Sequence, residues 1–335
     1  MKAAVIFAPG PPQALQYIDV PDPVCGPGEL LMRVDVISIE GGDTLNRTRP
    51  LPRGAPHIVG YQASGEVVRF GEGVTGFAAG DRISAFAFDG SHAELRAVKA
   101  EHAFRVPDKM DLVDAAVVPI SFGTAHDALF GAARLQPGET VLVQGAAGGV
   151  GMAAVQIASR VGARVIAAAS SAAKLAPMPE LGAWATIDTR TQQVAQTALE
   201  LTGGKGVDVV MDGVGGAMLQ QSILGLAHGG RIALVGAAGR EGMMVDVSTL
   251  QRGAQSLTGV FLGPKLGTPM AHAVIEGYLR DVAAGRYRTL ISRRFALSDA
   301  AAAHAFVESR NAVGRVVLVT DSYRHLHPCF MASSR

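Results

Sequence analysis

A glycine-rich segment at mid-chain has the residue types and spacing of a phosphate-binding turn. Gly145, Gly148 and Gly151 follow an apolar run at 141–144 and precede an apolar, helix-length run at 152–161. Glycines in this context permit a tight turn and the close approach of a pyrophosphate, whose charge then lies at a helix N-terminus. A turn without a ligand would use the same residues, but the flanking strand and helix favour binding. The residues expected to contact the phosphates are Gly145, Ala146, Gly148, Gly149, Val150 and Gly151.

Hydroxyl and basic side chains follow the next predicted strand, at 164–169. About twenty residues after such a turn, NAD-binding proteins place an acidic residue that holds the ribose. This chain has Ser170, Ser171 and Lys174 there and no carboxylate, so nothing would repel a 2′-phosphate. The serines could instead cap the following helix, and Lys174 could be a solvated surface charge. The missing acid nevertheless favours NADP(H) over NAD(H).

The overall composition excludes several classes of protein. With 335 residues, 48% hydrophobic and 18% charged, the chain can form two domains with large cores. A net charge of +1 provides no basic field for nucleic acid or an anionic membrane. Two cysteines are too few for a disulfide framework or a four-cysteine zinc site, and no apolar run reaches the roughly 18 residues of a membrane span. Residues 1–12 reach glycine and proline before a signal-peptide core forms, so we expect a cytoplasmic protein.

The pattern of predicted strands and helices divides the chain and gives an α/β fold class. Short β-branched runs between turn residues predict a mostly antiparallel first domain that resembles a partly open barrel. Later, alanine-rich helical stretches alternate with short apolar strands at 141–144, 164–169, 207–211 and 231–235, which predicts a parallel sheet covered on both faces. A final strand at 315–319 returns to the first domain. The predicted domains are residues 1–121 with 262–321 and residues 122–261, followed by a disordered tail at 322–335.

Several motifs follow one another along the chain, at 56–67, 80–83, 90–95, 144–151, 206–216, 229–232 and 314–318. Together they resemble the medium-chain dehydrogenase/reductase superfamily, in its zinc-independent quinone oxidoreductase and zeta-crystallin branch. The resemblance implies an N-terminal catalytic domain, a doubly wound cofactor domain and a substrate cleft between them. It also implies hydride transfer from NADPH to a quinone or an activated alkene. It further implies a homodimer paired through the edges of the cofactor-domain sheets.

The resemblance adds residues to the expected cofactor site. Relatives commonly place a tyrosine after the third strand of the cofactor domain, where it touches the 2′-phosphate. This chain has Thr189 there, with Arg190 beside it, so either the phosphate affinity is lower or Arg190 compensates. The other expected cofactor residues are Gly213, Val235, Gly236, Phe261 and Arg315.

The residues that hold zinc in metal-dependent relatives are replaced in this chain. Those relatives use a cysteine near the end of the second or third strand and a His-Glu pair after the glycine at position 60. This chain has no cysteine at 38–43 and has Tyr61 and Gln62 after Gly60. A catalytic zinc needs three protein ligands, so we expect no metal. Near the C-terminus, His325, His327 and Cys329 have metal-ligand spacing, but an exposed tail holds no rigid site unaided.

Five residues of the first domain are the candidate catalytic residues. Asp43 and Arg47 match the family pattern near the nicotinamide, and their spacing of four also suits a structural ion pair on a helix. Glu40 stands where quinone reductases commonly have asparagine. It is either a proton relay, which would need a raised pKa, or a solvated acid of a loop. Tyr61 and Gln62 occupy the vacated metal position, where they could hydrogen-bond a substrate carbonyl or be satisfied within their loop.

The sequence therefore predicts an NADPH-dependent reductase of quinones or other conjugated carbonyls that uses no metal. Two alternatives remain open. One is an enoyl-thioester reductase, and the other is a non-catalytic NADPH-binding protein similar to lens zeta-crystallins. All three would bind NADPH, but only the enzymes would oxidise it when offered an acceptor.

Overall fold

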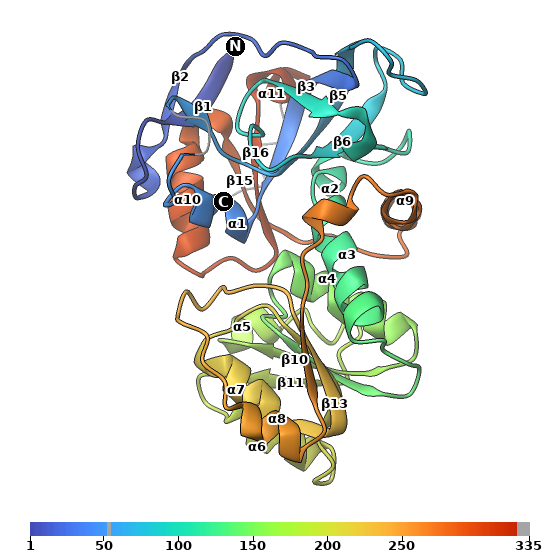
Figure 1. The fold of residues 1–335 in the computed structure, drawn as a ribbon. Helices are drawn as coiled ribbons and strands as arrows, with labels where there is room; N and C mark the ends of the chain where they lie inside the picture. Colours follow the sequence, from blue (N-terminus) through green and yellow to red (C-terminus); the bar gives the residue numbers. More distant parts are fainter. Residues whose placement is uncertain (52–54, 327–335) are drawn as a thin grey trace. The chain divides into compact units, whose positions relative to one another are not determined.

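The computed structural model describes residues 1–51 and 55–326, and the chain forms two units (Figure 1). One unit comprises Met1–Ile120 together with the chain after Leu262, and the other comprises Ser121–Leu262. The chain enters the second unit within helix α3 (Val118–His126). Among the described residues, no helix is long and apolar enough to cross a membrane.

The second unit is built on a parallel sheet of six strands. These are β9 (Thr140–Gln144), β10 (Arg164–Ala169), β11 (Ala185–Asp188), β12 (Val207–Asp212), β13 (Leu226–Leu234) and β14 (Ser256–Gly259). Their order across the sheet is β11-β10-β9-β12-β13-β14, and every neighbouring pair is parallel. In chain order this is the arrangement of dinucleotide-binding domains, whose ligands bind at the carboxyl ends of the strands where the order reverses. In this sheet the order reverses between β9 and β12.

Helices cover both faces of this sheet, and the burial of its central strands shows it. All residues of β9 and nearly all of β12 are buried, which for a strand requires cover on both sides. The covering elements, besides α3, are a π-helical turn η3 (Asp127–Ala132), α4 (Gly149–Arg160), α5 (Ala172–Leu175), α6 (Val194–Leu201), α7 (Ala217–Leu224) and α8 (Val247–Arg252).

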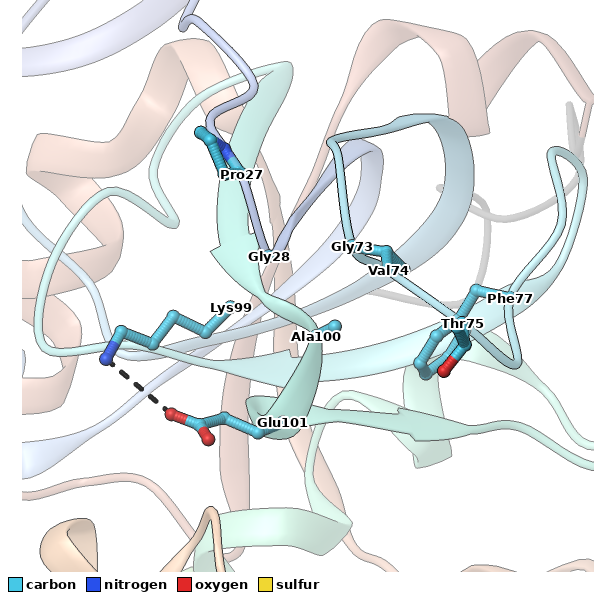
Figure 2. Close-up of a pocket in the computed structure, with 9 residues that line it drawn as sticks. All are labelled: Pro27, Gly28, Gly73, Val74, Thr75, Phe77, Lys99, Ala100 and Glu101. Atoms are coloured by element: carbon cyan, nitrogen blue, oxygen red, sulfur yellow. Dashed lines mark ion pairs between the residues drawn. The ribbon is translucent and has the colours of Figure 1, made fainter.

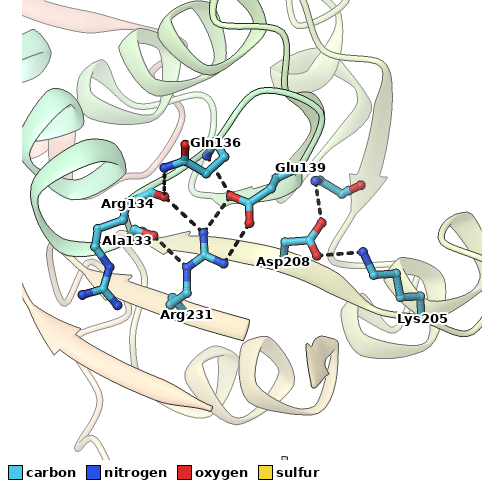
Figure 3. Close-up of polar contacts among 8 residues, drawn as sticks. Ala133, Arg134, Gln136, Glu139, Lys205, Asp208 and Arg231 are labelled. Atoms are coloured by element: carbon cyan, nitrogen blue, oxygen red, sulfur yellow. Dashed lines mark hydrogen bonds and ion pairs between the residues drawn. The ribbon is translucent and has the colours of Figure 1, made fainter. Parts of the chain in front are cut away.

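Ion pairs tie together the amino ends of the parallel strands, at the edge opposite the glycine turn (Figure 3). Arg231 donates to both carboxylate oxygens of Glu139, at 2.9 and 2.7 Å, and to the carbonyl oxygen of Ala133. Asp208 accepts from the backbone N–H of Thr140 and from the ammonium of Lys205, both at 2.8 Å. Bidentate guanidinium–carboxylate contacts are strong and directional, so this network stabilises the register of the sheet.

The first unit contains two mostly antiparallel sheets. A sheet of seven strands has the order β15-β16-β3-β5-β6-β8, with β7 also paired to β3, and a smaller sheet has the order β2-β1-β4. The pairing of β3 with β5 shifts register twice, once by an extra residue of β5 opposite the step from Leu31 to Met32 and once by an extra residue of β3 between Val34 and Val36, and β3 also pairs with β7. The strands are β1 (Lys2–Ile6), β2 (Gln16–Asp19), β3 (Glu29–Ile39), β4 (His57–Ile58), β5 (Gln62–Phe70), β6 (Arg82–Phe86), β7 (Leu95–Lys99), β8 (Ala103–Arg105), β15 (Ile291–Ala296) and β16 (Arg315–Val319).

Short helices join and cover these strands around one apolar core, which includes Ile6, Leu30, Met32, Ile37 and Ile83. Strand β16 pairs with β3, so a segment near the end of the chain completes the sheet of the first unit. The helices are α1 (Gly41–Asn46), α2 (Leu112–Ala115), α9 (Pro269–Ala283), α10 (Ala300–Glu308) and α11 (Asp321–Leu326), with 3-10 turns η1 (Pro12–Ala14), η2 (Ala100–His102), η4 (Gly263–Lys265) and η5 (Leu297–Asp299).

The prediction of a disordered tail from residue 322 is wrong for residues 322–326, which belong to α11. Ser322 donates to Asp35 at 2.8 Å, and the hydroxyl of Tyr323 donates to Asp111 at 3.0 Å. Tyr323 is only 3% exposed, so an aromatic side chain anchors a segment whose composition looks polar and patternless. The predicted metal ligands His327 and Cys329 lie outside the described residues.

Candidate active site

The glycine turn of the second unit forms a cradle that fits a pyrophosphate. A Cβ added to Gly151 would lie 2.3 Å from the carbonyl oxygen of Gly145, so only glycine allows α4 to pack this closely on the turn. Helix α4 begins at Gly149 without a side-chain cap, and the N–H of Met152 is bonded to the carbonyl of Gly148. The three preceding N–H groups therefore have no partner within the helix and are directed to its N-terminal end.

This cradle lies at the point where the strand order reverses. Gln144 and Asp212 are aligned in the register of β9 and β12. The Asp212 carboxylate accepts two backbone N–H groups of the loop that follows it, at 2.8 and 2.9 Å, and the hydroxyl of Ser222 at 3.0 Å. Ser222 in turn accepts from Gln144 at 3.3 Å. This buried network fixes the loop that begins at Gly213, and nothing in the sequence analysis identified it.

The remaining residues expected at the cofactor occupy different places. Val235 and Gly236 lie beside Gly213: a Cβ on Gly236 would be 3.2 Å from the carbonyl oxygen of Gly213, and the N–H of Val235 bonds to the carbonyl of Asp212. Phe261 follows β14 and is exposed. The structure therefore brings Gly213, Val235 and Gly236 together at the reversal point.

A hydroxyl and a cation meet after β10, where a 2′-phosphate is expected. The ammonium of Lys174 donates to the hydroxyl of Ser170 at 3.0 Å. Ser171 caps α5, so this serine performs the structural role that the sequence left open. Arg190 follows the neighbouring strand β11, and its backbone N–H donates to Asp188. The Ser170–Lys174 pair fits an anionic group at this strand end.

Arg315 is engaged inside the first unit rather than with the other expected cofactor residues. Its guanidinium donates to the hydroxyl of Ser38 at 3.2 Å and to the carbonyl of Ile39, and it forms an ion pair with Glu40. Arg315 begins β16, and this strand pairs with β3, so the register itself places the guanidinium beside Glu40.

The acidic residues at the start of α1 are buried and bonded to each other's backbone. Glu40 is the N-cap, and its N–H donates to Asp43 at 2.8 Å in a capping box. Glu40 is only 5% exposed, so it is not the solvated loop acid that the sequence allowed. Burial raises the pKa of Glu40, while Arg315 and Gln62 act in the opposite direction. Burial also raises the pKa of Asp43 to about 8, against the bond from the Glu40 backbone.

Gln62 is satisfied within the first unit. Its amide nitrogen donates to Glu40 at 2.6 Å, and its amide oxygen accepts from the N–H of Ile120 at 3.1 Å. The side chain is completely buried. Of the two roles considered for Gln62, these contacts support the structural one.

Of the two roles considered for Asp43 and Arg47, the structural ion pair between them does not form. The Arg47 guanidinium instead reaches α10, where it binds Glu308 at 2.5 Å and the Nδ1 atom of His304 at 2.7 Å, and it also donates to the carbonyl of Gly10. Only the backbone N–H of Arg47 bonds to the Asp43 carbonyl. The reason is the capping box, which turns the Asp43 carboxylate toward the N-terminus of α1, while Arg47 leaves from its C-terminus.

Two buried histidines continue this chain of contacts. The Nε2 atoms of His92 and His304 are 2.9 Å apart, and Nδ1 of His92 is 3.1 Å from the hydroxyl of Ser91. Because arginine can only donate, Nδ1 of His304 accepts from Arg47, and the proton of this imidazole is on Nε2. Nε2 of His304 therefore donates to Nε2 of His92. The proton of His92 is then on Nδ1, which donates to the Ser91 hydroxyl. Burial lowers the pKa of His92 to about 3 and that of His304 well below 6.5. Both imidazoles are therefore neutral at pH 7.

Tyr61 is held from several sides. Its N–H donates to Asp43 at 3.1 Å, its carbonyl accepts from Arg96 at 2.9 Å, and its side chain is hydrogen-bonded to Asn46. A Cβ on Gly42 would lie 2.3 Å from a ring carbon of Tyr61, so the phenol packs directly on α1. Burial and the nearby Asp43 raise the pKa of Tyr61, which keeps its hydroxyl protonated. The phenol is thus a hydrogen-bond donor at neutral pH.

Arg96, which the sequence analysis did not identify, holds the main chain around Tyr61 in place. It is buried, and one terminal nitrogen donates to the carbonyls of Gly60, Tyr61, Ala87 and Asp89. These carbonyls come from two separate loops, so Arg96 joins the loops to each other. The sequence did not indicate this contact, because Arg96 lies in an ordinary strand pattern.

A separate pocket of about 520 Å³ opens on the surface of the first unit (Figure 2). Lys99 and Glu101 form an ion pair at 3.6 Å along its wall. None of the candidate residues lines it, so it adds nothing to the candidate active site. Its lining residues are Pro27, Gly28, Gly73, Val74, Thr75, Phe77, Lys99, Ala100 and Glu101.

Within residues 1–51 and 55–326, no three His, Cys, Asp or Glu side chains are grouped so that they could hold an ion. The independence from zinc stays a prediction.

Known proteins share both halves of this architecture. Residues 26–108 match the model of the alcohol dehydrogenase GroES-like domain, and residues 149–276 match the model of the zinc-binding dehydrogenase. A quinone oxidoreductase of Pseudomonas aeruginosa is 35% identical over 323 residues, covering 95% of this chain and 99% of that protein. The chain belongs to the quinone oxidoreductase branch of the medium-chain dehydrogenase/reductase family.

Two further relatives of this family member agree with the assignment. A 2-haloacrylate reductase of a Burkholderia species is 33% identical, covering 96% of this chain and all of that protein. The solved structure of a mycobacterial protein complexed with NADPH has a TM-score of 0.90 and 33% identity, covering 95% of this chain and 100% of that one. The predicted family, the fold class and the assignment to the oxidoreductases are confirmed.

Proposed function

We propose that this protein reduces quinones or other conjugated carbonyl compounds with NADPH and without a metal. The cofactor is NADPH, and the observation that carries this assignment is the glycine cradle at the strand-order reversal, with Ser170 and Lys174 at the neighbouring strand end. The unit built on the parallel sheet is the cofactor domain, and the other unit binds the substrate. When bound, NADPH supplies the hydride.

The first unit supplies the groups that act on the substrate. The Tyr61 phenol is protonated at neutral pH, because burial and Asp43 raise its pKa, so its O–H can donate to a carbonyl oxygen of the substrate. Such a donor stabilises negative charge that develops on that oxygen. A quinone needs little of this help, because its reduced oxygens can take protons from solvent. An enone or an acrylate needs more.

The test is to measure NADPH oxidation with a panel of acceptors: a quinone, a simple enone, a 2-haloacrylate and an enoyl thioester. Oxidation with the quinone or the simple conjugated compounds supports the proposal. Oxidation with the thioester alone would assign an enoyl-thioester reductase instead. Tight NADPH binding without turnover on any acceptor would assign the non-catalytic role.

We also propose a homodimer paired through β14, which is an edge strand of the parallel sheet. Exposed apolar side chains lie in the segments next to it, with Met244 86% exposed and Val247 and Phe261 also exposed. Edge strands and clustered exposed apolar residues are typical of subunit contacts.

Activity that survives a chelator would support independence from zinc. The cytoplasmic location rests on the sequence prediction.

A further inference from the structure

Three neighbouring strand ends of the first unit bring a carboxylate, an amide and a guanidinium together. Glu40 follows β3 directly, Gln62 begins β5, and Arg315 begins β16. Strand β3 pairs with both other strands, with Ser38 opposite Gln62 on one side and Ile39 opposite Val316 on the other. The sheet register therefore fixes which three side chains meet.

These side chains form one closed set of contacts. The Oε1 atom of Glu40 accepts from Gln62 at 2.6 Å and from Ser38 at 3.3 Å, and it forms the ion pair with Arg315. All three residues of the set are buried. A buried guanidinium without a counter-charge is strongly unfavourable, so the Glu40 carboxylate stabilises Arg315, and Gln62 stabilises that carboxylate in turn.

The same set is joined to Tyr61 through the main chain. Gln62 is the next residue after Tyr61, and the N–H groups of Glu40 and Tyr61 both donate to the Asp43 carboxylate, at 2.8 and 3.1 Å. The ring of Tyr61 rests on Gly42, one residue before Asp43. A shift of residue 40 or residue 62 therefore moves the phenol.

We propose that Glu40 and Gln62 are positioning residues that direct the Tyr61 phenol toward the substrate carbonyl, with Arg315 as the counter-charge of Glu40. The inference rests on the proposed function, in which Tyr61 is the donor. It assigns a specificity to the site: correct placement of the phenol matters for enones and acrylates and matters little for quinones, which need no strong donor.

The test exchanges the carboxylate and the amide between the two strands. Glu40→Gln leaves Arg315 without its counter-charge, and Gln62→Glu places two carboxylates in contact. The double variant Glu40→Gln/Gln62→Glu keeps one carboxylate and one amide within the set. We expect each single variant to lose about tenfold or more in kcat with an enone and less than about threefold with a quinone, because misplacing a donor removes part of the 100- to 1,000-fold that such groups supply. The double variant should recover the wild-type ratio of the two rates to within about threefold.

A matched control is Asp35→Asn, which neutralises another buried carboxylate of β3. Asp35 is bonded to Ser322 and Arg33, away from the set described above. This control should lower the thermal unfolding temperature without changing the ratio of enone to quinone kcat. A Tyr61→Phe background provides a second check, since positioning residues that act through Tyr61 should not change the ratio further once its hydroxyl is absent.

The outcomes separate this inference from the function on which it rests. Equal losses with enone and quinone, no recovery in the double variant, or an undiminished effect in the Tyr61→Phe background would each overturn the positioning role alone. Wild-type protein that reduces neither acceptor would overturn the proposed function and this inference with it. If a single variant does not fold, the double variant decides, because it must fold and keep the wild-type ratio.

Discussion

At the level of single residues, we expect Lys174 to determine the preference for NADPH over NADH. Its ammonium and the Ser170 hydroxyl lie 3.0 Å apart at the end of β10, where no carboxylate follows the strand. Lys174→Ala should weaken NADPH binding about tenfold or more and leave NADH binding nearly unchanged, because only NADPH has the 2′-phosphate that attracts this charge. Fluorescence titration with each cofactor measures both constants.

Lys205→Ala is the matched control for this prediction. Lys205 belongs to the same unit and pairs with Asp208 near the amino ends of the strands, so its removal should affect neither cofactor. Equal losses for NADPH and NADH in Lys174→Ala would show that this lysine supports the fold of the turn rather than recognising the phosphate.

Residue types and spacing identified the residues of the candidate site. They did not predict the hydrogen bonds and ion pairs that these residues form. The glycine turn, Ser170 with Lys174, and the group from Glu40 to Gln62 were all identified from the sequence. The spacing of Asp43 and Arg47 allowed an ion pair as one of two roles, and this pair does not form, because the capping box uses the Asp43 carboxylate. The true partners of Arg47, on α10, are more than 250 positions away, and no local pattern indicates such contacts.

At the level of elements, the histidine pair fastens α10 to the loop before β7. His304 lies on α10 and His92 precedes β7, and both are neutral in the folded protein. An unfolded histidine has a pKa near 6.5. Between about pH 3 and pH 6.5 the unfolded chain therefore binds more protons than the folded chain, and the free energy of unfolding decreases as the pH falls.

We expect this pair to make the protein sensitive to mild acid. Each buried imidazole contributes up to roughly 1.4 kcal/mol of destabilisation per pH unit inside that window. In His92→Gln/His304→Gln the decrease should be shallower, because these titrating groups are gone. Urea unfolding at several pH values between 7 and 5 measures the slope.

The exposed His325 of α11 provides the control for the histidine pair. His325→Gln should leave the pH dependence of unfolding unchanged. A double variant of the buried pair with the wild-type slope would show that other groups cause the acid sensitivity.

The elements themselves were predictable to different degrees. Alternation of apolar strands with helix-length segments predicted the central strands β9, β10, β12 and β13, because buried parallel strands are short and continuously apolar. Strand β15 was missed, since its sequence ISRRFA places two arginines inside it. One of these arginines stacks on Phe295 and Phe306, an arrangement that only the tertiary structure provides.

At the level of the whole molecule, the sequence predicted the α/β fold class with its parallel sheet, but not which strands of the first unit pair with one another. The reason is physical. Register in the parallel unit follows from the alternation of strand and helix, whereas in the first unit it depends on two register shifts, one in β3 and one in β5, and on the pairing of β3 with both β5 and β7. Bulge positions depend on neighbouring strands and leave no regular pattern in the sequence.

The proposed homodimer would form through the edge of the parallel sheet at β14, and a surface substitution can test it. Met244 lies in the segment before α8, and it is 86% exposed, so a charge there should not disturb the folded chain. In a dimer that buries this side chain, Met244→Asp would place an unpaired carboxylate in an apolar contact and favour the monomer. Met270→Asp is the matched control, because Met270 is 79% exposed on α9 of the other unit. Light scattering at micromolar concentration should give the mass of a dimer for the wild type and Met270→Asp and the mass of a monomer for Met244→Asp, whereas a monomeric wild type would overturn the dimer outright.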